Sequence, residues 1–410
     1  MFTDRFPFAG GEQFLETEIG YLVERFEKVL LVPRFTQGSQ RALPASVEVD
    51  TSLATLLPQG LKKHIYRMLS GLRSLSFYHE LLDHRGLLHH PIAMYRAASY
   101  WHTACSTAQW LQFRFEQHAI NPVDSIFYTY WLGGVSFGIG LLKSRYPNLR
   151  LVSRAHGADL YEERYKPAYQ PFRAHTLKGL DLLALISEHG KNYIQQHWRL
   201  NNVQSEVYRL GVNDPGFNTQ QSMDGVFRLV SCSYLVALKR LPLLIHALHI
   251  LVENHPNLHI EWHHLGDGPL RADLESLAAA ILPSVKWVFH GQLSNADILA
   301  FYRDNPVDVF VNVSETEGVP VSIMEAYSCG IPAIATAVGG VAELVSMENG
   351  ILLDAQTSSR QIAEALAMIV FNPAVAADKR TLSKQTWRLT ANAAVNYNRF
   401  SNRLMQLYLA

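Results

Sequence analysis

Cysteine is scarce in this chain of 410 residues, and neither sign of charge is in excess. The three cysteines, Cys105, Cys232 and Cys329, show no paired spacing, so neither a disulfide framework nor a four-thiolate zinc site is indicated. Lys plus Arg and Asp plus Glu number 36 each, which gives no electrostatic reason to expect a nucleic-acid partner. At this length we expect two domains.

Long apolar runs are also missing. The first ten residues include Asp4 and Arg5 and lack the apolar stretch of a signal peptide. The longest uncharged run near membrane-span length, 126–142, has 17 residues and four glycines, whereas a spanning helix needs about 20 mostly apolar residues. We interpret this run as a buried strand, a glycine turn and a helix, and we expect the chain to stay in a reducing cytoplasm.

Two further patterns are absent. The dinucleotide fingerprint G-x-G-x-x-G does not occur, which argues against a nicotinamide dehydrogenase. The 18 histidines show no metal-site spacing; His79 and His84 are five residues apart, about 140° around a helix, so they cannot share one metal on one face. We therefore predict no bound metal.

The second half of the chain alternates strand-like and helix-like segments. Apolar runs typical of strands occupy residues 227–231, 258–265, 285–290, 307–313 and 331–335. Helical spacing occupies residues 241–254, 270–281, 295–305 and 321–329, and a short helix is expected at 341–345. Such alternation predicts a parallel sheet covered on both faces, which is a doubly wound α/β domain.

The first half has the same character with longer helices. Strands are expected at 29–33, 125–130, 149–155, 182–187 and 207–210, and long helices at 61–88 and 93–118. The basic, leucine-rich segment 61–88 has two interpretations, a core-facing amphipathic helix or a membrane-surface helix. We predict domains at 1–212 and 213–385. The remaining residues, 386–410, are expected to belong to a long final helix, roughly 384–409, that crosses back to the first domain.

One motif places acidic side chains directly after a strand. Glu317 follows the strand 307–313, where ligands of open parallel sheets bind. Pro320 suits the first turn of the next helix, whose N-terminal N–H groups would form an anion site. Glu325 lies about one turn into that helix, and a carboxylate can accept two hydrogen bonds from a sugar diol. The alternative is a solvated loop glutamate followed by an exposed helix glutamate.

Two other strand ends carry candidate ligand groups. Gly266 and Gly268 follow the strand 258–265, where glycine lets the backbone approach a ligand closely. Lys239 and Arg240 follow the strand 227–231, where two cations can stabilise a diphosphate leaving group. Taken alone, these are also compatible with a plain turn and a solvated basic pair.

In this order, the three motifs resemble the retaining glycosyltransferases of family 4. The resemblance covers most of residues 207–346 and includes the glutamate pair Glu317 and Glu325 and the segment ATAVGGVAEL at 335–344. It implies a GT-B fold, two Rossmann-like domains facing each other across a cleft.

The resemblance also assigns roles. Glu325 would hold the nucleotide ribose, Glu317 the transferred sugar, and Lys239 the donor phosphates. Gly318, Val319 and Pro320 would line the pyrophosphate and sugar pocket. The family usually has an arginine five residues before the lysine; this chain has Tyr234 there, and Arg240 is the candidate to supply the charge.

The first domain resembles the family more loosely. His156, after the strand 149–155, would lie beside the donor sugar, with Asp159 as a lesser candidate. Gly10 and Gly11 resemble the glycine loop that meets the diphosphate and the acceptor, although the strand before them is short. The alternative for His156 and Asp159 is a polar loop with an Asp helix cap.

The resemblance implies sugar transfer from a nucleotide sugar to a saccharide or lipid-linked acceptor, with retention of configuration and without a metal or other cofactor. It suggests cell-surface polysaccharide assembly, in the cytoplasm or at the inner face of the cell membrane with peripheral contact. Two alternatives stay open: a nucleotide-sugar epimerase of the same fold, and a catalytically inactive sugar-nucleotide-binding protein.

Overall fold

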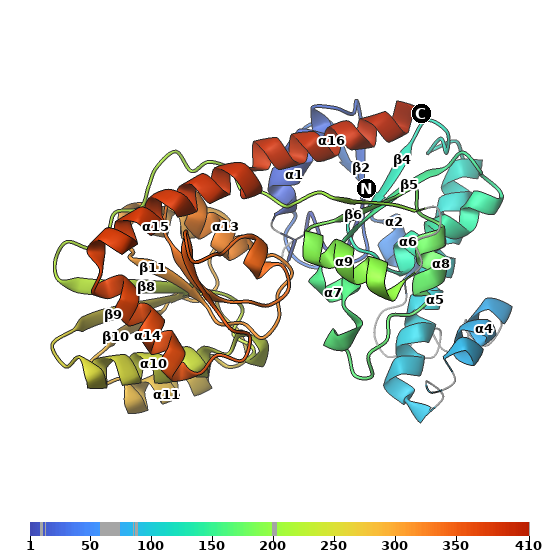
Figure 1. The fold of residues 1–410 in the computed structure, drawn as a ribbon. Helices are drawn as coiled ribbons and strands as arrows, with labels where there is room; N and C mark the ends of the chain where they lie inside the picture. Colours follow the sequence, from blue (N-terminus) through green and yellow to red (C-terminus); the bar gives the residue numbers. More distant parts are fainter. Residues whose placement is uncertain are drawn as a thin grey trace. The chain divides into compact units, whose positions relative to one another are not determined.

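The chain forms two compact units, each built around its own parallel sheet (Figure 1). The computed structural model describes residues 1–410 except 9–10, 13, 58–73, 85, 87–88, 199–202 and 410. Unit 1 comprises residues 1–208 and 397–410, and unit 2 comprises residues 209–396. The prediction of two doubly wound α/β domains is confirmed. Within the described ranges, no helix is both long enough and apolar enough to cross a bilayer.

Unit 2 is a six-stranded sheet with the strand order β10-β9-β8-β11-β12-β13. Its strands are β8 (Val226–Cys232), β9 (His259–Leu265), β10 (Lys286–Phe289), β11 (Val309–Asn312), β12 (Ala333–Thr336) and β13 (Gly350–Leu353). Its helices are α10 (Leu241–Asn254), α11 (Arg271–Ile281), α12 (Asn295–Asp304), α13 (Val321–Ser328), α14 (Ser359–Val370) and α15 (Pro373–Thr386), with a 3-10 turn at Val341–Glu343.

Helices cover both faces of this sheet, as the apolar strands require. Every residue of β11 and β12 is buried. One hydrophobic cluster joins the inner faces of α10, α11 and α14 to β8, β9 and β11, while α13 and α15 lie on the opposite face (Figure 1). All five pairings are parallel, so the loops that follow the strands gather at one edge.

Unit 1 is a seven-stranded sheet with the strand order β3-β2-β1-β4-β5-β6-β7. Its strands are β1 (Phe2–Thr3), β2 (Val29–Pro33), β3 (Val47–Val49), β4 (Ile126–Thr129), β5 (Arg150–Ala155), β6 (Leu182–Leu185) and β7 (Gln204–Val207). Its described helices are α1 (Leu15–Val23), α2 (Ser52–Leu56), α4 (Leu75–Asp83), α5 (Pro91–Glu116), α6 (Gly134–Leu141), α7 (Gly157–Leu160), α8 (Arg173–Lys178) and α9 (Glu188–His197), joined by most of α16 (Ala393–Leu409).

The two faces of the unit 1 sheet bury separate clusters. On one face, α1 and α16 contribute Leu22, Phe400 and Leu404. On the other face, α5, α6 and α9 pack over β4, β5 and β6. The C-terminal segment of the chain is therefore part of the core of unit 1.

The glycine-rich run 126–142 forms β4, a turn and α6, so the strand–turn–helix prediction is confirmed. The glycines serve helix packing: a Cβ on Gly138 would lie 2.3 Å from the Ala104 carbonyl oxygen, and one on Gly134 would lie 2.7 Å from that of Tyr100. Only glycine lets α6 approach α5 this closely.

Three sequence-based expectations were wrong. The final helix is not continuous, because a π-helical turn at Trp387–Ala391 and the extended Asn392 separate α15 from α16. The last strand of the first half is β7 at Gln204–Val207 and not 207–210. The strands β3 and β13 were missed. Of the helix expected at 61–88, residues 61–73, 85 and 87–88 lie outside the described residues, and α4 begins at Leu75.

Candidate functional site

Lys239 and Glu317 form an ion pair in unit 2, in loops that follow β8 and β11. The Lys239 ammonium lies 2.6 Å from Glu317 Oε1, and the Asn312 side-chain amide donates to the same oxygen at 3.3 Å. The Glu317 side chain is only 12% exposed. Glu317 is thus not a solvated loop residue; it faces a cation at the carboxyl edge of the sheet.

Glu325 is buried on α13 and is held by one partner. The Asn295 side-chain amide, at the start of α12, donates a hydrogen bond to Glu325 Oε1. Burial raises the pKa of Glu325 to about 7, and the hydrogen bond from Asn295 opposes that rise. The Glu325 carboxyl group is therefore shielded from water, and Asn295 binds its Oε1 but not its Oε2.

The thiol of Cys232 interacts electrostatically with Glu325 and with Lys239, the ion-pair partner of Glu317. Cys232 ends β8, and burial raises the pKa of its thiol; the Glu325 carboxylate raises that pKa further, while the Lys239 ammonium lowers it. The thiol is therefore within electrostatic range of both groups. Lys239, Glu317 and Glu325 belong to one edge of one sheet.

The loops around Glu317 are locked by close backbone contacts. Gly339 has φ +55°, and a Cβ there would lie 2.0 Å from the Glu317 carbonyl oxygen. The Gly340 N–H donates to the Gly318 carbonyl at 2.7 Å. The loops after β11 and β12 are thus in direct backbone contact at Glu317 and at the predicted pocket residue Gly318.

The helix α13 begins after Pro320. Pro320 was expected in the first helical turn; it is instead the residue that precedes the helix, and Val321 is the first helical residue. The first intrahelical bonds come from the Ile323 and Met324 N–H groups to the Pro320 carbonyl. The N–H groups of Val321 and Ser322 lie ahead of them, at the positive end of the helix dipole.

Arg240 supports the loop after β11. Its guanidinium donates to the carbonyls of Val313 at 2.6 Å, Ser314 at 3.0 Å and Ala355 at 2.9 Å. Three of its five N–H groups are thereby used. Tyr234, at the position where the family has arginine, is 58% exposed. Donor contact by Arg240 stays a prediction, and the loop support is an observed additional role.

Gly266 and Gly268 pack against the neighbouring loop. A Cβ on Gly266 would lie 2.0 Å from the Ser233 carbonyl oxygen, and one on Gly268 would lie 2.7 Å from the Leu235 nitrogen. The Leu235 N–H also donates to the Asp267 carbonyl at 2.9 Å. Glycine is required at these two positions because the backbone passes close to the loop after β8. Contact of Gly266 and Gly268 with a sugar donor stays a prediction.

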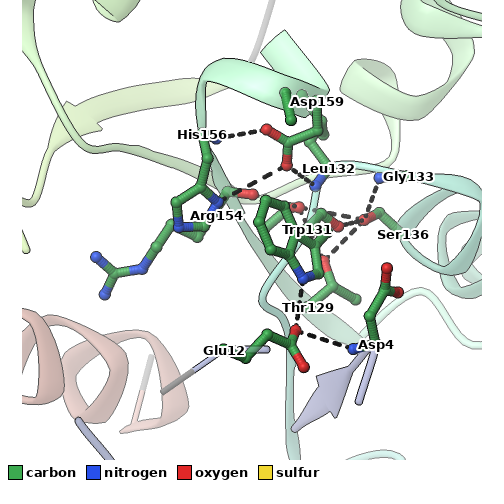
Figure 2. Close-up of polar contacts among 12 residues, drawn as sticks. Asp4, Glu12, Thr129, Trp131, Leu132, Gly133, Ser136, Arg154, His156 and Asp159 are labelled. Carbon is green, nitrogen blue, oxygen red and sulfur yellow. Dashed lines mark hydrogen bonds and ion pairs between the residues drawn. The ribbon is translucent and has the colours of Figure 1, made fainter. Parts of the chain in front are cut away.

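His156 lies at the carboxyl end of β5 in unit 1, 7% exposed (Figure 2). Its ring packs against Tyr130 and Trp131, each with a centroid distance of 4.5 Å. Asp159 accepts the main-chain N–H groups of His156 at 2.5 Å and Leu132 at 2.8 Å. Among the residues that the structure describes, neither imidazole nitrogen of His156 has a hydrogen-bond partner. Asp159 is thus a helix cap, and its Oδ2 lies 3.8 Å from His156 Nδ1, beyond hydrogen-bond distance.

Sequence reasoning missed Glu12, the residue that holds the loop before α1. Glu12 is 7% exposed and has φ +54°. Its carboxylate accepts the N–H groups of Asp4, Arg5 and Phe6, as well as the Trp131 indole N–H (Figure 2). No motif pointed to it, because its donors come from two separate segments, residues 4–6 and Trp131, which lies 119 residues away. Gly11 has φ +151° beside the Arg5 side chain; Gly10 lies outside the described residues.

A buried ion pair lies beneath His156. The Arg154 and Glu18 side chains are 0% and 1% exposed and 3.0 Å apart. Arg154 also donates to the Tyr128 hydroxyl at 2.8 Å and to the Tyr208 carbonyl at 3.1 Å, and it lies over the Phe400 ring. This pair ties β5 to α1 and α16.

Known proteins are similar to this chain in both sequence and fold. The family model described as glycosyl transferases group 1 matches residues 218–386. A putative colanic acid biosynthesis glycosyltransferase, WcaL of Escherichia coli K12, is 26% identical over 226 residues, which are 53% of this chain and 54% of that protein. The structure of a sucrose-phosphate synthase from Thermosynechococcus elongatus has a TM-score of 0.70 at 16% identity, covering 100% of this chain and 98% of that one. The structure of HepE from Anabaena in complex with UDP has a TM-score of 0.64 at 15% identity, covering 99% of both chains.

The extent of these matches limits what each one establishes. The matched segments span between 15% and 54% of the length of the curated relatives. The solved structures, at these identities, show a common two-domain fold. The segment matched by the family model contains β8–β13 and all the candidate groups of unit 2. The match to the model described as glycosyl transferases group 1 therefore covers 169 of the 410 residues of this chain, all of them between residues 218 and 386.

Proposed function

We propose that this protein transfers a glycosyl group from a nucleoside-diphosphate sugar to an acceptor hydroxyl, with retention of anomeric configuration. The observation that carries the proposal is the half-buried Lys239–Glu317 pair beside the start of α13. A cation, a carboxylate and a helix N-terminus at one sheet edge match the phosphate and hydroxyl groups of such a donor.

In the proposed reaction, the bond between the anomeric carbon and the diphosphate oxygen breaks, and the diphosphate departs with the electron pair. Lys239 and the N–H groups at the start of α13 stabilise the negative charge that develops on it. The acceptor oxygen attacks from the same face, and the leaving phosphate takes the acceptor proton. This charge stabilisation uses the protein's own groups, so we propose that no metal or other cofactor takes part.

The other groups bind the donor. Glu317 would accept hydrogen bonds from hydroxyl groups of the transferred sugar. Glu325, which has one oxygen not bound by Asn295, would accept a hydrogen bond from a ribose hydroxyl. His156, whose ring nitrogens are unpartnered among the described residues, would contact the donor sugar from unit 1. The UDP complex of the Anabaena neighbour makes UDP-sugars the first donors to test.

The acceptor and its setting are proposed on family likeness. A similar protein is described as a putative colanic acid biosynthesis glycosyltransferase. We propose a saccharide or lipid-linked acceptor in cell-surface polysaccharide assembly, on the cytoplasmic side and at the inner membrane face.

The test compares Lys239→Ala, Glu317→Ala and the control Glu315→Ala, which removes an exposed carboxylate two residues from Glu317. Transfer should fall about 10²-fold in the first two variants, as for loss of one preorganised charge contact, and should stay near wild type in the control. Wild-type turnover in both test variants would reject this site. Release of a free sugar epimer in place of a glycoside would identify an epimerase, and donor binding without turnover across an acceptor panel would identify an inactive binding protein.

A further inference from the structure

We infer that Glu12 is a positioning residue that fixes the imidazole of His156 through the indole of Trp131. The inference deepens the proposed function and rests on it for the kinetic part of its test. Glu12, Trp131 and His156 lie in the loops that follow β1, β4 and β5, three adjacent strands of the unit 1 sheet. Figure 2 shows the indole lying between the other two side chains.

The first step is the binding of Glu12 itself. Its Oε1 accepts the Asp4 N–H at 3.0 Å and the Trp131 indole N–H at 2.5 Å. Its Oε2 accepts the Arg5 and Phe6 N–H groups, both at 2.6 Å. Three successive main-chain N–H groups form a concavity of the kind that binds anions. All four neighbours are donors, so the site requires a group that only accepts.

The backbone of Glu12 is consistent with a special role. A non-glycine residue with φ +54° adopts a sparsely populated conformation that costs roughly 1 kcal/mol or more. The four hydrogen bonds, made while the side chain is 7% exposed, offset that cost. The carboxylate therefore fixes the loop after β1 and, at the same time, the indole of Trp131.

The second step is the contact between Trp131 and His156. Their ring centroids are 4.5 Å apart with an interplanar angle of 49°, and Tyr130 lies at the same distance with an angle of 39°. Because neither imidazole nitrogen of His156 is hydrogen-bonded to a described residue, ring packing sets its orientation. Asp159 holds the main chain of His156 but lies 3.8 Å from Nδ1. Movement of the indole would therefore move the imidazole.

The consequence concerns catalysis more than folding. Both ring nitrogens of His156 are buried without a hydrogen bond to a described residue, so the orientation of the imidazole depends on the neighbouring rings staying in place. Misplacement of a contact group by about 1 Å can cost up to about 10²-fold in rate. Glu12 thus acts on the reaction without touching the substrate.

The test uses two variants and a control. In Glu12→Gln, the side-chain NH₂ group would face main-chain or indole N–H groups, which are also donors. A hydrogen bond of Glu12 is therefore lost, and the Trp131 indole is no longer held in place. Trp131→Phe keeps an aromatic ring beside His156 but removes the indole N–H. The matched control is Glu16→Gln, which changes a half-exposed carboxylate that pairs with Arg41. With a donor and acceptor that support turnover, both test variants should lower kcat about tenfold, with the donor KM within about twofold; the control should change neither.

The spectroscopic arm needs no activity. In NMR spectra of the full chain, the Trp131 indole N–H and the His156 ring signals should both shift in Glu12→Gln, and the His156 signals should shift in Trp131→Phe. Glu16→Gln should leave them in place. If Glu12→Gln fails to fold, Trp131→Phe decides alone. Unmoved His156 signals, or a lowered thermal midpoint with unchanged kcat, would overturn the inference. A wild-type protein without transfer activity would reject the proposed function and leave the NMR result to decide the role of Glu12.

Discussion

Replacing Glu325 by glutamine should stabilise the ligand-free protein at alkaline pH. Burial raises the pKa of Glu325 to about 7 from its ordinary 4.5. Above pH 7 the folded protein therefore holds a buried carboxylate at a cost of about 3 kcal/mol, at about 1.4 kcal/mol for each pH unit between the two values. Glutamine retains an oxygen that can accept the Asn295 amide and does not ionise.

The pH dependence has a definite sign. Between pH 4.5 and 7 the unfolded chain loses this proton while the folded chain keeps it, so the wild-type free energy of unfolding falls as pH rises. The variant lacks that fall. The free energy of unfolding of the variant minus that of wild type should therefore be about 3 kcal/mol larger at pH 8 than at pH 4.5.

Urea unfolding of both proteins at pH 5, 6, 7 and 8 measures this difference, with Glu348→Gln as a control at an exposed position. The same variant should bind a nucleotide sugar more weakly, because the predicted ribose acceptor is changed. A difference between Glu325→Gln and wild type that does not vary with pH would refute the reasoning.

Two further predictions follow from the packing of each unit. Arg154→Met should lower the free energy of unfolding of unit 1 by about 3–5 kcal/mol, because it leaves the Glu18 carboxylate buried and unpaired; a loss below about 1 kcal/mol in urea unfolding would contradict this. Gly339→Ala should reduce transfer at least tenfold, since its Cβ would push the Glu317 carbonyl away. Gly225→Ala is the matched control for Gly339→Ala, with φ +79° and no atom within 4 Å of the added Cβ, and equal activity in the two variants would argue against loop displacement.

The alternation of apolar strands and amphipathic helices was enough to predict five of the six strands of unit 2 and its helices α10 to α13, whereas β13, α14 and α15 were not predicted. The helix α10 begins and ends at the expected residues, and the ends of β8, β9 and β11 differ from expectation by at most two residues. Local pattern and burial agree best in β11 and β12, where every residue is buried. The short edge strand β3 and the break at Trp387–Asn392 depend on tertiary contacts and had no such pattern.

The candidate site was predictable where its residues are close in sequence. Glu317 and Glu325 follow one strand, and their place at the sheet edge is a consequence of parallel topology. The partners Asn312 and Asn295 became evident only from the structure, as did Glu12, whose donors lie up to 119 residues away. Hydrogen bonds between distant segments leave no periodic trace in a sequence.

The order in which the units are completed during synthesis follows from the course of the chain. Unit 2 is a single continuous segment, and its core can assemble once residue 396 has left the ribosome. Unit 1 lacks Phe400 and Leu404 until the ribosome has passed them, so the half that is synthesised first is finished last. Until then, the apolar faces of α1 and β2 and the Arg154 guanidinium are not yet covered by the side chains of α16. Unit 1 is therefore most exposed to misassembly and chaperone binding during that interval.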